Sequence, residues 1–107
     1  MWLCTQHGFF SIVQKIPGEF HIRGRLRVDM DNLVKLCGGD WPIIETKSGD
    51  YRYPIVCGQT EVSAVLAKLA TSIDYSNFKS RIHAEPHQAD KSAAYSKLSG
   101  NLYELQA

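Results

Sequence analysis

Two stretches of the chain share a pattern in which alternating large and polar side chains lead into helical spacing. In the first, residues 15–22 read Lys-Ile-Pro-Gly-Glu-Phe-His-Ile, and a helical pattern follows at 31–36. In the second, residues 47–53 read Lys-Ser-Gly-Asp-Tyr-Arg-Tyr, and a helical pattern follows at 64–69. The offset is about 31 residues at the turns and about 33 in the helices. This repeat predicts two hairpin–helix units that bury a common core.

The first unit is predicted to hold two long strands. Residues 2–16 are rich in β-formers with apolar side chains on both faces, which predicts one central strand with a bulge at Gly8. After the Pro17-Gly18 turn, residues 20–28 alternate strictly between apolar and polar side chains. One face is expected to pack on the core with Phe20, Ile22, Leu26 and Val28, and the other to carry His21, Arg23, Arg25 and Arg27.

Helical spacing and turn signals place the remaining elements. A helix ends at Gly38-Gly39, and a second hairpin pairs residues 42–47 with 50–57, where Pro54 requires a sheet edge or a local distortion. Three further helices follow, the last from about Gln88. The expected N-caps are Asp29 or Asp31, Thr60 and Asp74.

The order ββα-ββα-αα predicts a single α+β domain over residues 1–107. We expect a two-layer fold, ferredoxin-like in general character, with a four-stranded antiparallel sheet and helices on one face. The chain has 107 residues, of which 44% are hydrophobic and 21% charged, as in ordinary globular domains. Its net charge of +1 gives no overall attraction to nucleic acid or to anionic membranes.

The cysteines and the start of the chain indicate a cytoplasmic protein. Cys4, Cys37 and Cys57 form no CxxC pair and no metal-ligand spacing, which is typical of reduced thiols. The first seven residues have no basic segment followed by a long apolar run and resemble the start of a strand. No window approaches the roughly 18 apolar residues of a membrane span.

A basic row is the first candidate binding site. If helices cover the apolar face, the sheet presents cations that could hold phosphates or a single-stranded nucleic acid. Alternatively, this is a solvated face whose arginines pair with Glu19, Glu45 or Asp50. The residues concerned are His21, Arg23, Arg25, Arg27 and Arg52.

A second candidate is a pocket for a small polar ligand where the short helix meets the second hairpin. Its side chains combine aromatic faces with hydrogen-bonding ends. The alternative is local capping and core packing around Phe78. The residues concerned are Tyr51, Tyr53, Asp74, Tyr75, Asn77 and Lys79.

No catalytic residue, metal or cofactor is assigned. His83 and His87 have i, i+4 spacing, but Pro86 breaks the helix that a shared metal would need. Cys4 and His7 could form a nucleophile pair, whereas Cys37 and Cys57 lie at apolar positions typical of buried thiols.

Several segments together are similar to a family of small bacterial proteins with no assigned activity. The likeness spans nearly the whole chain and implies a bacterial cytosolic protein, without implying any chemistry. The segments are Met1-Trp2-Leu3-x-Thr5-x-x-Gly8-Phe9-Phe10-Ser11-Ile12-Val13, the arginine strand, Tyr51-Arg52-Tyr53, Ile73-Asp74-Tyr75-x-Asn77-Phe78-Lys79, and Asp90-Lys91 before Tyr95.

These observations favour a non-catalytic protein-interaction or regulatory binding module. The partner is expected to be another protein or a second copy of the chain, through the sheet edges and the open face. The alternative is a binder of single-stranded nucleic acid or of an anionic ligand that uses the basic row.

Overall fold

The structure, a computed structural model, describes residues 1–47 and 49–106. The chain divides into two compact units, Met1–Ile73 and Asp74–Ala107. The prediction of one domain over residues 1–107 is not tested by this division and stays a prediction.

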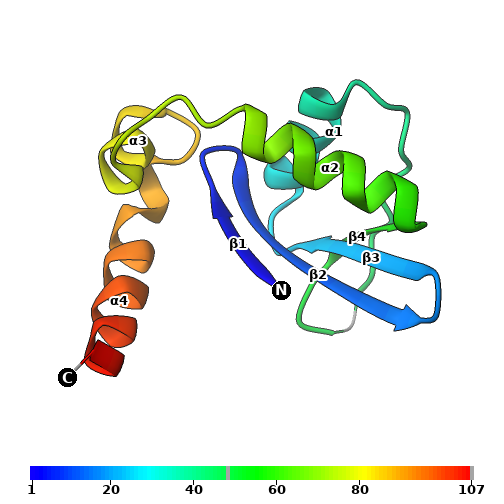
Figure 1. Ribbon diagram of the computed structural model, residues 1–107, viewed down its shortest axis with the longest axis horizontal. Coiled ribbons are helices and arrows are strands. Elements are labelled where there is room, and N and C mark those ends of the chain that lie inside the picture. The colour runs from blue at the N-terminus through cyan, green and yellow to red at the C-terminus, as the bar shows by residue number, and fades with distance from the viewer. Residues whose placement is uncertain (48, 107) are drawn as a thin grey trace. The chain divides into compact units, whose positions relative to one another are not determined.

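A four-stranded antiparallel sheet forms one layer of the first unit (Figure 1). Its order, β1-β2-β3-β4, means that each strand pairs with its neighbours along the sequence. The predicted α+β class with an antiparallel sheet is therefore confirmed. The strands are β1 (Trp2–Thr5), β2 (Gly8–Ile16), β3 (Glu19–Gly24) and β4 (Tyr53–Cys57).

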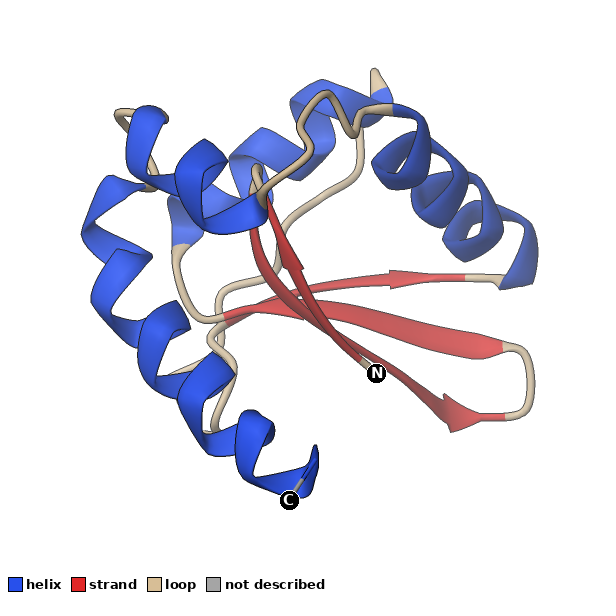
Figure 2. Cartoon of the chain, turned by 60° about the vertical axis from the view of Figure 1, so that its left-hand side comes forward, coloured by secondary structure: helices blue, strands red, loops and turns tan. Residues whose placement is uncertain are grey.

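Two helices of the first unit, α1 (Arg27–Cys37) and α2 (Gln59–Thr71), pack on one face of this sheet (Figure 2). Both helices present an apolar stripe to the strands, which is why they bury one side and leave the other solvated. The core therefore lies between the sheet and the two helices. Its buried residues are Phe10, Ile12, Ile22, Met30, Leu33, Ile55, Val62, Val65 and Leu69.

The second unit is helical. It contains α3 (Phe78–Ala84), a short 3₁₀ helix η1 (Ala89–Lys91), α4 (Ser92–Tyr103) and a final 3₁₀ turn η2 (Glu104–Gln106). The ring of Phe78 lies 5.3 Å from that of Tyr95 and 6.0 Å from that of Tyr75, centroid to centroid. These contacts confirm the predicted packing around Phe78.

The expected strand over residues 2–16 is two strands. Thr5 Oγ1 accepts hydrogen bonds from the N–H groups of His7 and Gly8 and donates one to the Gly8 carbonyl. Such side-chain bonds to the backbone stabilise a tight turn. The prediction of one bulged strand is therefore wrong, and β1 and β2 form a hairpin.

The second hairpin is also shorter than expected, because only β4 joins the sheet. The N–H of Ile44 donates to the Pro54 carbonyl (2.9 Å) and that of Thr46 to the Arg52 carbonyl (2.8 Å), but residues 42–47 form no strand. Pro42 and Pro54 lack the N–H that a continuous ladder needs. The first half of the chain therefore supplies three strands and the second half one, so the predicted repeat of two equal units is wrong. Of the two alternatives for Pro54, a sheet edge or a local distortion, the structure shows the sheet edge.

The strand predicted over residues 20–28 ends early, at Gly24, and α1 begins at Arg27. A Cβ on Gly24 would lie 2.8 Å from Met30 Sδ, so the helix turns back closely over the end of the strand. Phe20 and Ile22 pack on the core as predicted. Leu26 and Val28 were expected there and are exposed instead, because the alternation of the strand no longer applies to them.

The expected helix caps differ from those in the structure. Leu26 and Gly58 precede α1 and α2 without side-chain caps, so Asp29, Asp31 and Thr60 are not N-caps. The cap of α3 is Asn77, whose Oδ1 accepts a hydrogen bond from the N–H of Ser80, and not Asp74. At α1 the side chain of Asp29 does not cap the helix because it binds the backbone of Phe9 instead.

Asp29 is buried in the first turn of α1, with a side chain that reaches the start of β2. Its Oδ2 accepts a hydrogen bond from the N–H of Phe9 at 3.2 Å, and only 1% of the residue is exposed. A buried carboxylate in this position ties the helix to the first hairpin and lies at the positive end of the helix dipole.

Replacing Asp29 with alanine should therefore destabilise the protein by about 2–3 kcal/mol, since a buried N–H loses a charged acceptor. Asp31→Ala is the matched control, because Asp31 lies in the same helix turn but is exposed and pairs only at the surface with Arg27. We expect that change to cost about 0.5 kcal/mol or less. Urea denaturation of both variants measures the difference; equal losses would contradict the structural role of Asp29.

Candidate functional site

The face of the sheet opposite α1 and α2 follows from the strand register. Leu3, Phe10 and Ile22 point to the core, so their neighbours along each strand point the other way. We call this second surface the open face. Ser11 and Pro54 are buried within it. The face includes Trp2, Cys4, Phe9, Ser11, Val13, Glu19, His21, Arg23, Pro54 and Val56.

The open face is largely apolar. Trp2 is 62% exposed, and its ring packs edge-on against Phe9, with centroids 5.9 Å apart. Val56 on β4 is 44% exposed on the same face. These two side chains lie on opposite edge strands, with the half-buried Phe9 and Val13 on β2 between them. An exposed apolar surface of this kind is typical of sites that contact another molecule.

Arg23 and Arg25 do not form a free basic row, as one alternative predicted, but stack on the ring of Tyr51. Arg23 Cζ lies 4.5 Å and Arg25 Cζ 4.3 Å from the centroid of the Tyr51 ring. Arg23 Nη2 also donates to Ser11 Oγ (2.9 Å), and Arg25 Nη1 to the Asp50 carbonyl (2.7 Å). We call this group the arginine–tyrosine clamp, because it holds the segment before β4 against β3 and the adjoining turn. The clamp therefore joins two residues of the predicted basic row, Arg23 and Arg25, to one residue of the predicted polar pocket, Tyr51.

The other residues of the predicted basic row do not join the clamp. His21 lies on the open face, with Nε2 3.3 Å from Glu19 Oε2. Arg27 lies on α1 and pairs with Asp31 at 3.2 Å, so the prediction that it projects from the strand is wrong. Arg52 is exposed just before β4. The cations therefore do not form one free basic stripe.

The predicted polar pocket combines residues from both units. Tyr51 and Tyr53 belong to the first unit, and Tyr75 and Lys79 belong to the second. The pocket expected from their combination stays a prediction. Two further members have local partners within the second unit. Asn77 caps α3, as the capping interpretation expected, whereas Asp74 is not a cap and pairs with Arg81 at 3.0 Å.

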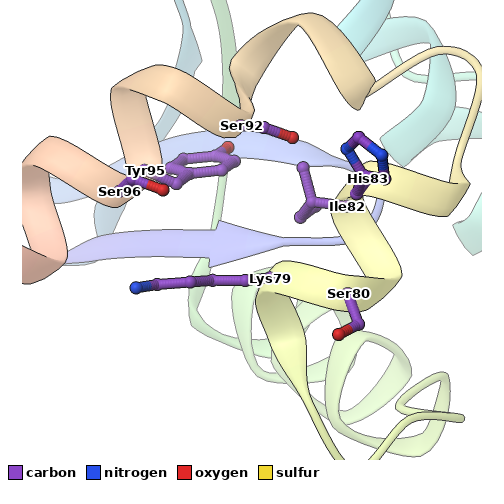
Figure 3. A pocket seen from close by; sticks show the side chains of 7 residues that line it. All are labelled: Lys79, Ser80, Ile82, His83, Ser92, Tyr95 and Ser96. Atoms are coloured by element: carbon purple, nitrogen blue, oxygen red, sulfur yellow. The ribbon is translucent and has the colours of Figure 1, made fainter.

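A different pocket, of about 370 Å³, lies within the second unit (Figure 3). Of its residues, the sequence predicts only Lys79 as a ligand-binding side chain, and His83 is considered only as a metal ligand. The missed signal is a pair of i, i+4 spacings, Lys79 with His83 on α3 and Ser92 with Ser96 on α4, each of which places two polar side chains on one helix face. The lining residues are Lys79, Ser80, Ile82, His83, Ser92, Tyr95 and Ser96.

The cysteines are free thiols in environments that disfavour nucleophilic chemistry. Burial raises the pKa of all three, Cys4, Cys37 and Cys57, and the carboxylate of Glu61 raises that of Cys57 further. Cys37 and Cys57 pack against the core, as predicted. A thiol with a raised pKa holds less of the reactive thiolate at neutral pH.

Metal and membrane sites are not found in the part of the chain that the structure describes. Residues 1–47 and 49–106 contain no group of three or more His, Cys, Asp or Glu side chains that could hold a metal ion. His87 follows the end of α3 at Ala84, so it does not share a helix face with His83. None of the described helices is both long and apolar enough to cross a membrane.

Comparison of the chain with models of protein families, with curated proteins and with solved structures finds no match. The resemblance to a family of small bacterial proteins therefore stays a prediction, and the geometry alone carries the functional argument.

Replacing Tyr51 with leucine should loosen the clamp and lower the free energy of unfolding by about 1–2 kcal/mol, since two cation–π contacts are lost. Tyr51→Phe is the control, because it keeps the ring and removes a buried hydroxyl that has no hydrogen-bond partner among the described residues. We expect that change to be nearly neutral. Urea denaturation compares the two; a larger loss in the phenylalanine variant would refute the clamp.

Alkylation of the cysteines should depend on folding. Because the folded-state pKa values are raised, less thiolate is present at a given pH and the rate profile moves to higher pH than in unfolded protein. Iodoacetamide labelling of native and urea-unfolded protein, followed by mass spectrometry across pH, measures this shift. A native cysteine that reacts faster than its unfolded counterpart at neutral pH would contradict it.

Proposed function

We propose that the chain is a non-catalytic protein-interaction module that associates with a second copy of itself through the open face of the sheet. The observation that carries this proposal is the exposure of Trp2, 62% of which is accessible on a face that α1 and α2 leave uncovered. Exposed tryptophan is enriched at protein interfaces, where its large ring contributes more binding energy than most side chains.

The polar groups of the open face support a second copy as the partner. Arg23 is engaged by Ser11 and Tyr51, and His21 lies against Glu19. Because these polar side chains already have partners within the chain, two such faces can meet about a two-fold axis with few hydrogen-bonding groups left to satisfy. The net charge of +1 adds little repulsion between copies.

The binding of single-stranded nucleic acid has weaker support. The guanidinium groups of Arg23 and Arg25 are engaged by Tyr51. Arg27 is paired with the carboxylate of Asp31. Backbone binding depends on cations that are free to replace counterions at phosphates. Affinity for single strands that does not fall as salt rises would remove this alternative.

The decisive experiment replaces Val56 with lysine, which places a charge in the proposed interface. We expect sedimentation velocity to show a concentration-dependent dimer for the unaltered chain and a dimer weakened at least about tenfold for Val56→Lys. Val28→Lys is a closely matched control, because Val28 is 43% exposed, like Val56 at 44%, but lies on α1, away from the open face.

Two outcomes would overturn the proposal. A monomer at every concentration would remove self-association. A dimer weakened equally by Val28→Lys and Val56→Lys would show that the open face is not the specific contact.

A further inference from the structure

The pocket between α3 and α4 has an apolar floor. Ile82 is fully buried and Tyr95 is nearly so, and both line the pocket. In Figure 3 these two side chains lie between His83 and Ser92 at one end and Lys79 at the other. A volume of about 370 Å³ is within the range of pockets that hold small ligands. Tyr95, which keeps 8% of its surface exposed above the buried Ile82, can therefore pack against the flat or apolar body of a small molecule.

Hydroxyl groups supply the polar part of the wall. Ser92 Oγ is buried and has no hydrogen-bond partner within residues 1–47 and 49–106. A buried hydroxyl without a partner is unfavourable, so a group that occupies the pocket and bonds to it gains free energy that the empty pocket lacks. Ser96 lies one helical turn further along α4 and is exposed.

Lys79 is the one side chain with a fixed positive charge among the seven lining residues, and no Asp or Glu is among them. The nearby acids Asp74 and Glu85 are paired with Arg81, at 3.0 and 3.2 Å. No salt bridge involves Lys79 in the described part of the chain. A free cation beside a wall without carboxylates favours an anionic ligand.

We infer that this pocket binds a small organic anion, a carboxylate or phosphate ester with an apolar body. The anionic group lies at Lys79, the body packs on Tyr95, and Ser92 Oγ donates a hydrogen bond to the ligand. Ligand binding at this site is a separate function from the proposed self-association and does not require it. NMR titration measures the first and sedimentation velocity the second.

The test titrates the full chain with four probes and follows amide shifts by NMR. Phenyl phosphate and benzoate carry both an anion and a ring, benzamide is the neutral counterpart of benzoate, and inorganic phosphate lacks the ring. We expect both ring-bearing anions to shift amides of α3 and α4 and to bind at least about tenfold more tightly than benzamide, from the loss of one charge-assisted contact. Inorganic phosphate should also bind more weakly than phenyl phosphate, because it cannot use the apolar floor.

Two substitutions test whether the charge of Lys79 is the one that binds the anion. Lys79→Met keeps the apolar stem and should lower the affinity for benzoate at least about tenfold. Lys97→Met is the matched control, since Lys97 is an exposed lysine on α4 outside the lining. We expect it to change the affinity by less than about twofold. Equal losses in the two variants, or equal affinity for benzoate and benzamide, would overturn the inference.

A third substitution tests the hydroxyl. Ser92→Ala should lower the affinity for benzoate while leaving the urea midpoint unchanged or raised, because the hydroxyl has no hydrogen-bond partner to lose among the described residues. A variant that loses stability but keeps its affinity would show that Ser92 is structural. Absence of binding by both phenyl phosphate and benzoate to the folded wild-type chain would likewise overturn the inference.

Discussion

The carboxylate of Asp29 is the contact on which the first unit depends. It is buried where α1 begins and accepts a hydrogen bond from Phe9 at the start of β2. The approach is so close that a Cβ on Gly8 would lie 2.5 Å from Asp29 Cβ, which only glycine avoids. The same turn receives the side-chain amide of Asn32, which donates to the His7 carbonyl at 3.0 Å. One hairpin turn therefore fixes α1 against the sheet through a charge and a neutral hydrogen bond.

This attachment determines which face of the sheet remains open. The end of α2 reaches the same turn, where Gln6 Nε2 donates to the Ser72 carbonyl at 2.7 Å. With both helices held on one side, alternation along each strand directs Ile22 inward and its neighbours His21 and Arg23 outward. The hydrogen bonds at this one turn thus determine which face is open, and the self-association that we propose uses that face.

The sequence predicts those features of the fold that depend on local pattern. It does not predict features that depend on contacts between residues far apart in the chain. Alternation places Phe20 and Ile22 in the core correctly, but it continues past Gly24, where the close approach of Met30 ends the strand. Asp29 resembles an N-cap by its position, and only its long-range bond to Phe9 shows otherwise. The clamp is a similar case, because no local signal indicates that Tyr51 would meet two arginines. The pocket has a partial sequence signal, since paired i, i+4 spacings on α3 and α4 place polar side chains on one face of each helix.

The distribution of cations separates structural from ligand-binding roles. An arginine row is the most conspicuous charge pattern in the sequence, yet Arg23 and Arg25 are used to hold Tyr51 and the Asp50 carbonyl. Planar guanidinium groups suit this task, because they stack on a ring and donate in fixed directions at the same time. Lys79, an isolated lysine, keeps a mobile point charge beside a pocket without carboxylates. A flexible ammonium can follow anions of different shape, which is why we assign ligand binding to the lysine and structural stabilisation to the arginines.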